Sequence, residues 1–206
     1  MRHWAVLLMV VLQAMAAAAS LLPTKPGEYR DPRDGQSYPT VQIAGMTWMA
    51  KNLNFASKES YCYQGSTENC LRYGRLYRWE AALSACPPGW HMSTEYEWQA
   101  LELAMGISRQ ELNQEGNRGS SQGARLKEGG DSGFNAQMGG WRRSEDSQYE
   151  AAGRAAALWT ATESNLERAW HRDVDTGDDQ IWRSPVIKPY GLSVRCVQNH
   201  DEDDGK

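Results

Sequence analysis

The sequence has 206 residues and a formal net charge of −4, and the last six residues, 201–206, supply −3 of that charge. The rest of the chain is therefore nearly neutral, which argues against a basic face for nucleic acid and a polybasic patch for a membrane surface. The length suits one domain with a substantial core. The 9 Trp against only 2 Phe suit either a polar, loop-rich core or a sugar-stacking surface.

Residues 1–19 have the pattern of a signal peptide. Arg2 is the only charged residue before an apolar run from Trp4 to Met15, and small residues follow it. The run is too short to span a membrane. The pattern predicts a protein that is secreted or periplasmic and soluble after cleavage, and residues 199–206 are expected to form an acidic disordered tail. The cleavage site stays open among Ala18, Ala19 and Ser20.

A turn and a hairpin open the expected domain. Residues 31–35 form a turn by composition, and Val41 and Ile43 alternate with polar neighbours before an Ala-Gly turn. This pattern predicts a hairpin that returns through residues 46–49.

Helices are expected in the middle of the chain. The first has its apolar face at helical spacing and ends at Pro87 and Pro88. The second begins at a capping box of Thr94 and Glu97, and a similar pair, Ser108 and Glu111, predicts a short third helix that ends at Gly116. The expected buried faces are Trp79, Ala82, Leu83 and Cys86 in the first helix, and Trp98, Leu101 and Met105 in the second.

Two polar segments, 116–133 and 139–153, are expected to be long loops, which in a compact domain are usually functional or mobile. Strand-like segments follow at 158–162, 168–174, 180–186 and 192–197. Helices in the middle with strands first and last indicate an α+β domain.

Four cysteines allow three disulfide pairings. Seven polar or turn-forming residues separate Cys62 from Cys70, which suits a local clasp. Cys86 and Cys196 would then close a loop of over 100 residues. The alternative is a zinc site that includes His91 or His171, but the sequence has no close CxxC or HxxxH pair. Two disulfides fit a chain that leaves the cytoplasm.

Six segments spread over residues 31–197 resemble the Fibrobacter succinogenes major paralogous domain, a family of exported bacterial proteins. They are DPRDG at 31–35, TWMAKNL at 47–53, YGRLYRW at 73–79, ACPPGWH at 85–91, WTATE at 159–163 and SVRCV at 193–197. The resemblance implies a C-type lectin-like domain over residues 29–198, with two main helices, a small twisted antiparallel sheet and long loops. It implies that Cys86, at the end of the first helix, is tied to Cys196 in the last strand. It also implies surface or secreted placement and a binding role.

Metal and catalytic chemistry find little support in the motifs. A calcium-dependent lectin site uses a Glu-Pro-Asn or Gln-Pro-Asp triplet, whereas residues 163–165 read Glu-Ser-Asn. Residues 173–179 offer four carboxylates, which we interpret as the polar tip of a hairpin. Neither His91 nor His171 accompanies a Gly-x-Ser-x-Gly motif. We therefore expect no metal, no cofactor and no enzymatic activity.

Ligand binding is the sharper hypothesis. Aromatic faces beside arginine forks suit carbohydrate stacking or a hot spot for a protein partner. The candidate residues are Trp141, Arg142, Arg143 and Tyr149 in the loop at 139–153, with Trp170 and Trp182 in the strands near it. The alternative is that these Trp residues fill the core. For Trp141 a core position and a surface position are equally consistent with the sequence, and for Trp170 and Trp182 a core position is favoured. The remaining tryptophans are assigned to the core, namely Trp48, Trp79, Trp90, Trp98 and Trp159.

The sequence thus predicts an exported, non-catalytic binding module for a glycan or an envelope or extracellular protein. The alternative function is that of an assembly subunit of a cell-envelope complex. A third, less favoured hypothesis is that the protein is an enzyme. The oligomeric state and the ligand stay open.

Overall fold

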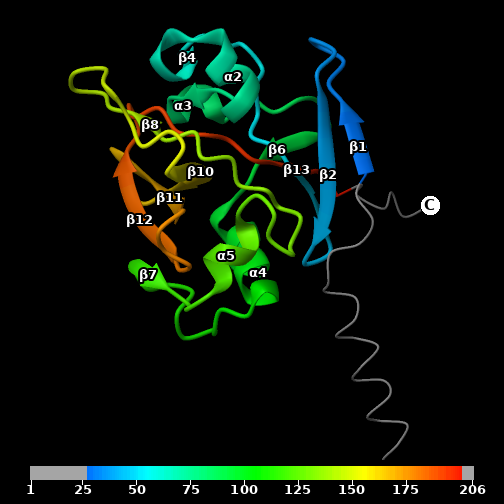
Figure 1. The fold of residues 1–206 in the computed structure, drawn as a ribbon, viewed down its shortest axis with the longest axis vertical. Helices are drawn as coiled ribbons and strands as arrows, with labels where there is room; N and C mark the ends of the chain where they lie inside the picture. The colour runs from blue at the N-terminus through cyan, green and yellow to red at the C-terminus, as the bar shows by residue number, and fades with distance from the viewer. Residues whose placement is uncertain (1–26, 201–206) are drawn as a thin grey trace, which may run out of the picture.

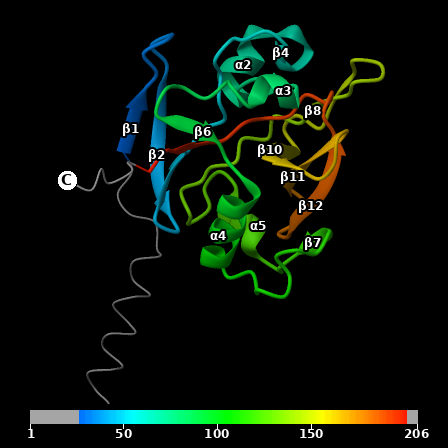
Figure 2. The same cartoon turned by 180° about the vertical axis from the view of Figure 1, so that it is seen from behind.

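The computed structural model describes residues 27–200, and two antiparallel sheets stand on opposite sides of this part of the chain (Figure 1). The five-stranded sheet has the order β1 (Gly27–Arg30), β2 (Ser37–Ile43), β3 (Met46–Met49), β13 (Cys196–Gln198) and β6 (Trp90–Met92). The four-stranded sheet has the order β10 (Ala155–Glu163), β11 (Arg168–Asp175), β12 (Ile181–Ile187) and β7 (Gly116–Arg118). Seen from behind, the segment that leads from β12 to β13 crosses between the two sheets (Figure 2).

Two small hairpins complete the strands. One pairs β4 (Ser60–Tyr61) with β5 (Leu76–Tyr77), and the other pairs β8 (Trp141–Arg142) with β9 (Tyr149–Glu150). The helices are α2 (Thr67–Tyr73), α3 (Trp79–Ala82), α4 (Glu95–Met105) and α5 (Gln122–Leu126), with a 3₁₀ turn η1 (Tyr63–Gly65).

The expected fold class is wrong. Residues 27–200 are mostly β, with four sheets and four short helices, whereas an α+β domain of the C-type lectin-like kind with two main helices and a small sheet was expected. Only α4 among these helices exceeds seven residues. Part of the error lies in segments 116–133 and 139–153, expected to be loops. They contain β7, α5, β8 and β9, whose strands pair with distant or facing segments that local sequence does not specify.

The first expected helix is a single turn. It ends at Ala82, before Leu83, whose side chain is 42% exposed. Four residues separate Ala82 from the Pro-Pro pair, and they form turns, so the apolar spacing beyond Ala82 does not mark a helix face. Ser108 also fails to begin a helix: its hydroxyl donates to Glu111 Oε2 at 2.6 Å, but residues 109–113 form turns only.

Other local predictions are confirmed. The opening hairpin is β2–β3, and its turn residues Ala44 and Gly45 both have positive φ, as the favoured two-residue hairpin turns require. α4 begins at Thr94 with a complete capping box to Glu97. The strand-like segments after residue 158 form parts of β10, β11, β12 and β13.

The core consists of two apolar clusters. In the first, Trp48, Trp98 and Phe134 meet edge to face with ring centroids 5.4–5.7 Å apart, between the five-stranded sheet and α4. The second gathers around Tyr77 and Trp159, both fully buried. The five tryptophans assigned to the core are all buried, namely Trp48, Trp79, Trp90, Trp98 and Trp159.

Both disulfides form, as Cys62–Cys70 and Cys86–Cys196. The first joins the start of η1 to α2, and the second ties the chain after α3 to β13. All four cysteines are therefore bonded, which removes the zinc alternative. Within residues 27–200, none of the helices combines the length and the apolar character that a bilayer crossing needs. The expected signal peptide and residues 201–206 of the expected tail lie outside the described residues.

Candidate ligand-binding site

The β8–β9 hairpin sorts the candidate residues onto two faces. Trp141 lies opposite Glu150, and Arg142 lies opposite Tyr149. Residues directly opposite each other in an antiparallel pair point to the same side, and successive residues alternate. Trp141 and Glu150 therefore share one face, which Arg143 joins, while Arg142 and Tyr149 share the other.

The face with Arg142 and Tyr149 packs on the Cys62–Cys70 segment. The Arg142 guanidinium lies 4.2 Å from the centre of the Tyr61 ring, and the Tyr149 ring is tilted against Tyr63 with centroids 5.3 Å apart. Arg142 also donates to Ser147 Oγ. These two candidate residues therefore hold the hairpin in place.

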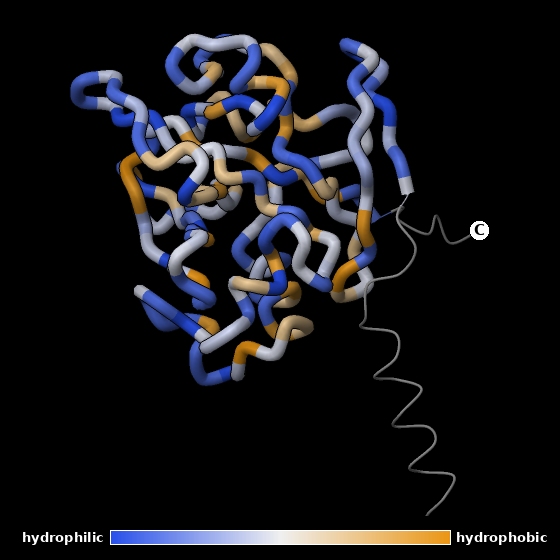
Figure 3. The backbone as a smooth tube through the Cα atoms, in the orientation of Figure 1, coloured by the Kyte–Doolittle hydropathy of each residue, from blue (hydrophilic) through white to orange (hydrophobic). Residues whose placement is uncertain are grey.

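The opposite face of the hairpin covers a pocket of about 310 Å³ over the four-stranded sheet. The hairpin runs out from one side of the molecule, and its connecting tip is hydrophilic (Figure 3). We call this cavity the hairpin pocket. Its lining residues are Trp141, Arg143 and Glu150 from the hairpin, Ala157, His171, Asp173 and Val186 from the sheet, and Tyr190 and Leu192 from the segment after β12.

Strand alternation places His171 and Asp173 together on the floor of the hairpin pocket. They are two residues apart on β11, and in the sheet register His171 lies opposite Trp159. The Trp159 ring meets the imidazole edge to face, with centroids 6.5 Å apart. The same register puts Ala157 opposite Asp173, so that the floor combines one apolar and two polar positions.

The two polar residues of the floor have unused hydrogen-bonding capacity. His171 Nε2 lies 3.3 Å from Asp173 Oδ2, a long contact. His171 is only 8% exposed, yet neither its Nδ1 nor Asp173 Oδ1 has a hydrogen-bond partner among the described residues. Buried polar atoms without partners are uncommon in native proteins, and a functional role is one of the explanations for them.

The rim of the hairpin pocket is rich in carboxylates. Arg143 lies within 3.1 Å of Glu150, 3.5 Å of Asp146 and 3.9 Å of Glu145. The hydrogen bond to Glu150 is the largest cause that raises the pKa of Arg143. Burial, followed by the nearby Glu145 carboxylate, raises the pKa of Tyr190. Carboxylates are thus the main cause of the Arg143 shift and a secondary cause of the Tyr190 shift.

A family model of the Fibrobacter succinogenes major domain matches residues 41–198, which include every residue of the hairpin pocket. The chain belongs to this family. The resemblance stated from the sequence is thereby confirmed. Comparison with curated proteins gives no match, and comparison with solved structures gives none either.

In this member of the Fibrobacter succinogenes major domain family, the two strand tryptophans lie away from the hairpin pocket. Trp182 is directly opposite Asp173 on the same face of the sheet and is 43% exposed, but it does not line the cavity. Its Nε1 donates to Ser184 Oγ at 2.9 Å. Trp170 lies on the other face of the sheet, where the Arg183 guanidinium stacks on its ring, 3.5 Å from the ring centroid.

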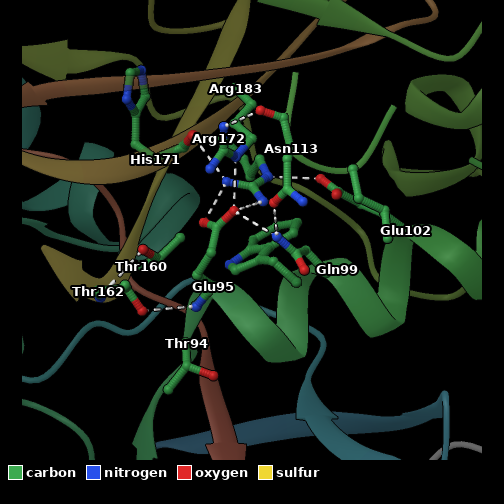
Figure 4. A network of polar contacts seen from close by, with 12 residues as sticks. Thr94, Glu95, Gln99, Glu102, Asn113, Thr160, Thr162, His171, Arg172 and Arg183 are labelled. Carbon is green, nitrogen blue, oxygen red and sulfur yellow. Dashed lines mark hydrogen bonds and ion pairs between the residues drawn. The ribbon is translucent and has the colours of Figure 1, made fainter. Parts of the chain in front are cut away.

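A buried ion network supports the floor from behind (Figure 4). On α4, Glu102 accepts from Arg172 Nε at 2.6 Å and from two nitrogens of Arg118, at 2.6 and 2.9 Å. Glu95 accepts from Arg172 at 2.8 and 2.9 Å and from Arg183 at 2.7 Å. Because Arg172 lies between the two floor residues on β11, this network fixes the strand that carries them.

The acidic segment 173–179 does not gather its carboxylates. Asp175 accepts from the Gly177 amide, Asp178 from Asn117 Nδ2 and Asp179 from Lys127 Nζ. In the part of the chain that the structure describes, no group of three or more His, Cys, Asp or Glu side chains is arranged to hold a metal ion. The segment connects β11 to β12, as a hairpin tip.

Of the six candidate residues, the structure brings Trp141 and Arg143 together at the hairpin pocket, while Arg142, Tyr149, Trp170 and Trp182 lie elsewhere. Sequence reasoning missed Glu150, His171, Asp173 and Tyr190 as pocket residues. Strand alternation in RAWHRDV was a usable signal for the floor pair, because it puts His171 and Asp173 on one face. For Glu150 and Tyr190 we find no local signal.

Proposed function

We propose that this protein is an exported, non-catalytic module that binds a carbohydrate in the hairpin pocket. The observation that carries the proposal is that the polar pair His171–Asp173 lines the same cavity as the aromatic side chains of Trp141 and Tyr190. Aromatic rings stack on the apolar faces of sugars, and carboxylate oxygens accept from sugar hydroxyls. Binding pockets for small molecules are typically lined by apolar and aromatic side chains, with a few polar groups that orient the ligand.

Export is supported by two disulfides, which persist in oxidising compartments, and by the signal-peptide pattern at residues 1–19. The proposal therefore includes a secreted or periplasmic location.

The contacts of the two pocket carboxylates, Glu150 and Asp173, favour a binding role over hydrolysis. A glycosidase needs one carboxylic acid that is protonated and ready to donate. Glu150 accepts from Arg143 at 3.1 Å, so one of its oxygens is already engaged as an acceptor. Asp173 faces the imidazole of His171, which can supply the proton of their contact.

The test is a glycan array followed by calorimetry on the purified protein, with and without a chelator. Trp141→Ala should weaken binding of any sugar found by about thirtyfold, the size of a binding hot spot. Tyr96→Ala is the matched control, because Tyr96 is 79% exposed on α4 and outside the hairpin pocket. Equal affinities of the two variants would refute the site, and release of cleaved sugar would refute the non-catalytic role. Binding to an envelope protein alone would refute the ligand class.

A further inference from the structure

We infer that the hairpin pocket selects sugars that carry a free, protonated amino group over neutral and acidic sugars. This inference rests on the proposed function and adds the charge of the ligand to it.

The first support is the unused capacity of the Asp173 carboxylate. An ionised carboxylate only accepts hydrogen bonds and offers about four lone-pair positions. Asp173 has one contact, the 3.3 Å approach of His171 Nε2, and its Oδ1 has no partner among residues 27–200. Oδ1 itself has no accessible surface, but the side chain is 27% exposed, so a ligand in the pocket meets the charge of this carboxylate through its other atoms. An ammonium group supplies three donors and a positive charge, whereas a sugar carboxylate supplies no donor and carries a negative charge.

The second support is the tautomer that the floor pair favours. Because the Asp173 carboxylate cannot donate, Nε2 of a neutral His171 must carry the proton that they share. Nδ1 is then an acceptor without accessible surface, so His171 offers no free donor to the pocket. The floor therefore accepts through Asp173, which a donor-rich ligand complements.

The third support is the balance of charge around the cavity. The single guanidinium of Arg143 has three carboxylates within 4 Å, those of Glu145, Asp146 and Glu150. Its positive charge is therefore more than offset, and Asp173 adds a further negative charge. An acidic sugar would meet like charge here, and a cationic one would be attracted.

The fourth support is the aromatic lining. Trp141 and Tyr190 both border the pocket, and the faces of such rings carry negative charge that attracts cations. An N-acetylated amine has no charge and would gain only the stacking contribution. The same sugar skeleton with and without the acetyl group is thus a matched pair of probes.

The experiment is titration calorimetry of the full chain with a glucosamine trisaccharide, with its fully N-acetylated form and with a galacturonate trisaccharide. We expect the amino form to bind at least about tenfold more tightly than the acetylated form, and the acidic form to bind most weakly. Asp173→Asn keeps the shape of the side chain but removes its charge, and should reduce the preference to within about threefold. Asp131→Asn removes the same charge at a 68% exposed position that does not line the pocket, and should leave the preference intact.

The outcomes separate the two proposals. If the acetylated or acidic trisaccharide binds as tightly as the amino form to the wild-type protein, the charge inference is overturned, while carbohydrate binding stands. If Asp173→Asn folds and keeps the full preference, Asp173 is not the selecting group and the inference is likewise overturned. If no sugar of the array binds, the proposed function fails, and the inference fails with it.

Discussion

His91 on β6 and Glu97 on α4 form a titratable pair whose two members stabilise the fold over different pH ranges. Nε2 of His91 lies 2.7 Å from Glu97 Oε1, and Nδ1 lies 2.7 Å from Asn199 Oδ1. The hydrogen bond to Glu97 is the main cause that raises the pKa of His91. Burial alone would raise the pKa of Glu97, but hydrogen bonds from His91 and Thr94 outweigh it and lower the pKa.

The pair therefore stabilises the protein most between the ordinary pKa values of the two groups, 4.5 and 6.5. The raised pKa of His91 gives stability that is complete below 6.5 and is lost as the pH rises through the folded-state value. The lowered pKa of Glu97 gives stability that is present above 4.5 and is lost as the pH falls.

We predict that the difference in free energy of unfolding between wild type and His91→Gln is largest near about pH 5.5 and shrinks by about pH 8.5. Urea denaturation at both pH values measures it. A difference that stays constant over this range would show that the pair contributes by packing alone.

At the scale of single elements, two similar sequence motifs have different outcomes. Thr94 accepts from the Glu97 amide and begins α4, whose apolar residues Trp98 and Leu101 are fully buried. The hydroxyls of Thr94 and Ser108 each donate to the carboxylate three residues later, Glu97 and Glu111, but the Ser108 contact lies in an exposed turn that does not continue as a helix. The difference lies in burial, because helix stability in proteins comes mainly from packing of an apolar face.

We predict that Thr94→Ala lowers the free energy of unfolding by about 1 kcal/mol, the usual loss of an N-cap. Ser108→Ala should change it by less than about 0.5 kcal/mol, since most exposed substitutions do. Thermal and urea unfolding of both variants makes the comparison. Equal losses would mean that the Ser108 turn stabilises the fold as much as a true helix cap.

These elements also show what the sequence could predict. α4, the β2–β3 hairpin and the last strands follow from local periodicity and capping, and their positions are confirmed. The helix expected after Trp79 is wrong because α3 ends at Ala82 and turns follow it. The loop expected at 139–153 is wrong because β8 pairs with β9, a pairing that local sequence does not specify. Nothing local predicts that Arg195 is fully buried, with neutral oxygens such as those of Met49 and Asn52 as its hydrogen-bond partners.

For the candidate site, the sequence pointed to the segment 139–153 but predicted a loop there, and it did not predict which side chains of the β8–β9 hairpin share a face. Trp141 and Arg143 line the pocket, and the intervening Arg142 faces the opposite way because strand residues alternate. The rest of the pocket comes from β10, β11, β12 and the segment after β12, so its assembly required the pairing register of the sheet.

At the scale of the whole molecule, the two disulfides restrain the chain very differently. Cys62–Cys70 spans 8 residues, whereas Cys86–Cys196 spans 110 and encloses α4 and the four-stranded sheet. In the chain-entropy model, a crosslink stabilises by restricting the unfolded state, and the effect grows with the logarithm of the loop length.

We predict that the double variant Cys86→Ala/Cys196→Ala loses about 5 kcal/mol of unfolding free energy, against about 2.5 kcal/mol for Cys62→Ala/Cys70→Ala. Urea denaturation of both double variants tests this ratio. If the short crosslink proves the more stabilising of the two, native contacts around it, such as those of Arg75 with both sulfur atoms, dominate over chain entropy.

The two-faced β8–β9 hairpin also sets how this protein can diversify. Its tip at residues 144–148 can change in length or composition without altering which side chains enter the pocket. A one-residue shift in the register of β8 would turn the strand over, sending Arg142 towards the cavity and Trp141 towards Tyr61. Such a shift would remove the pocket wall and the contact with Tyr61 together. Among relatives that keep this site, sequence differences should accumulate in the tip, and the register of β8 and β9 should be unchanged.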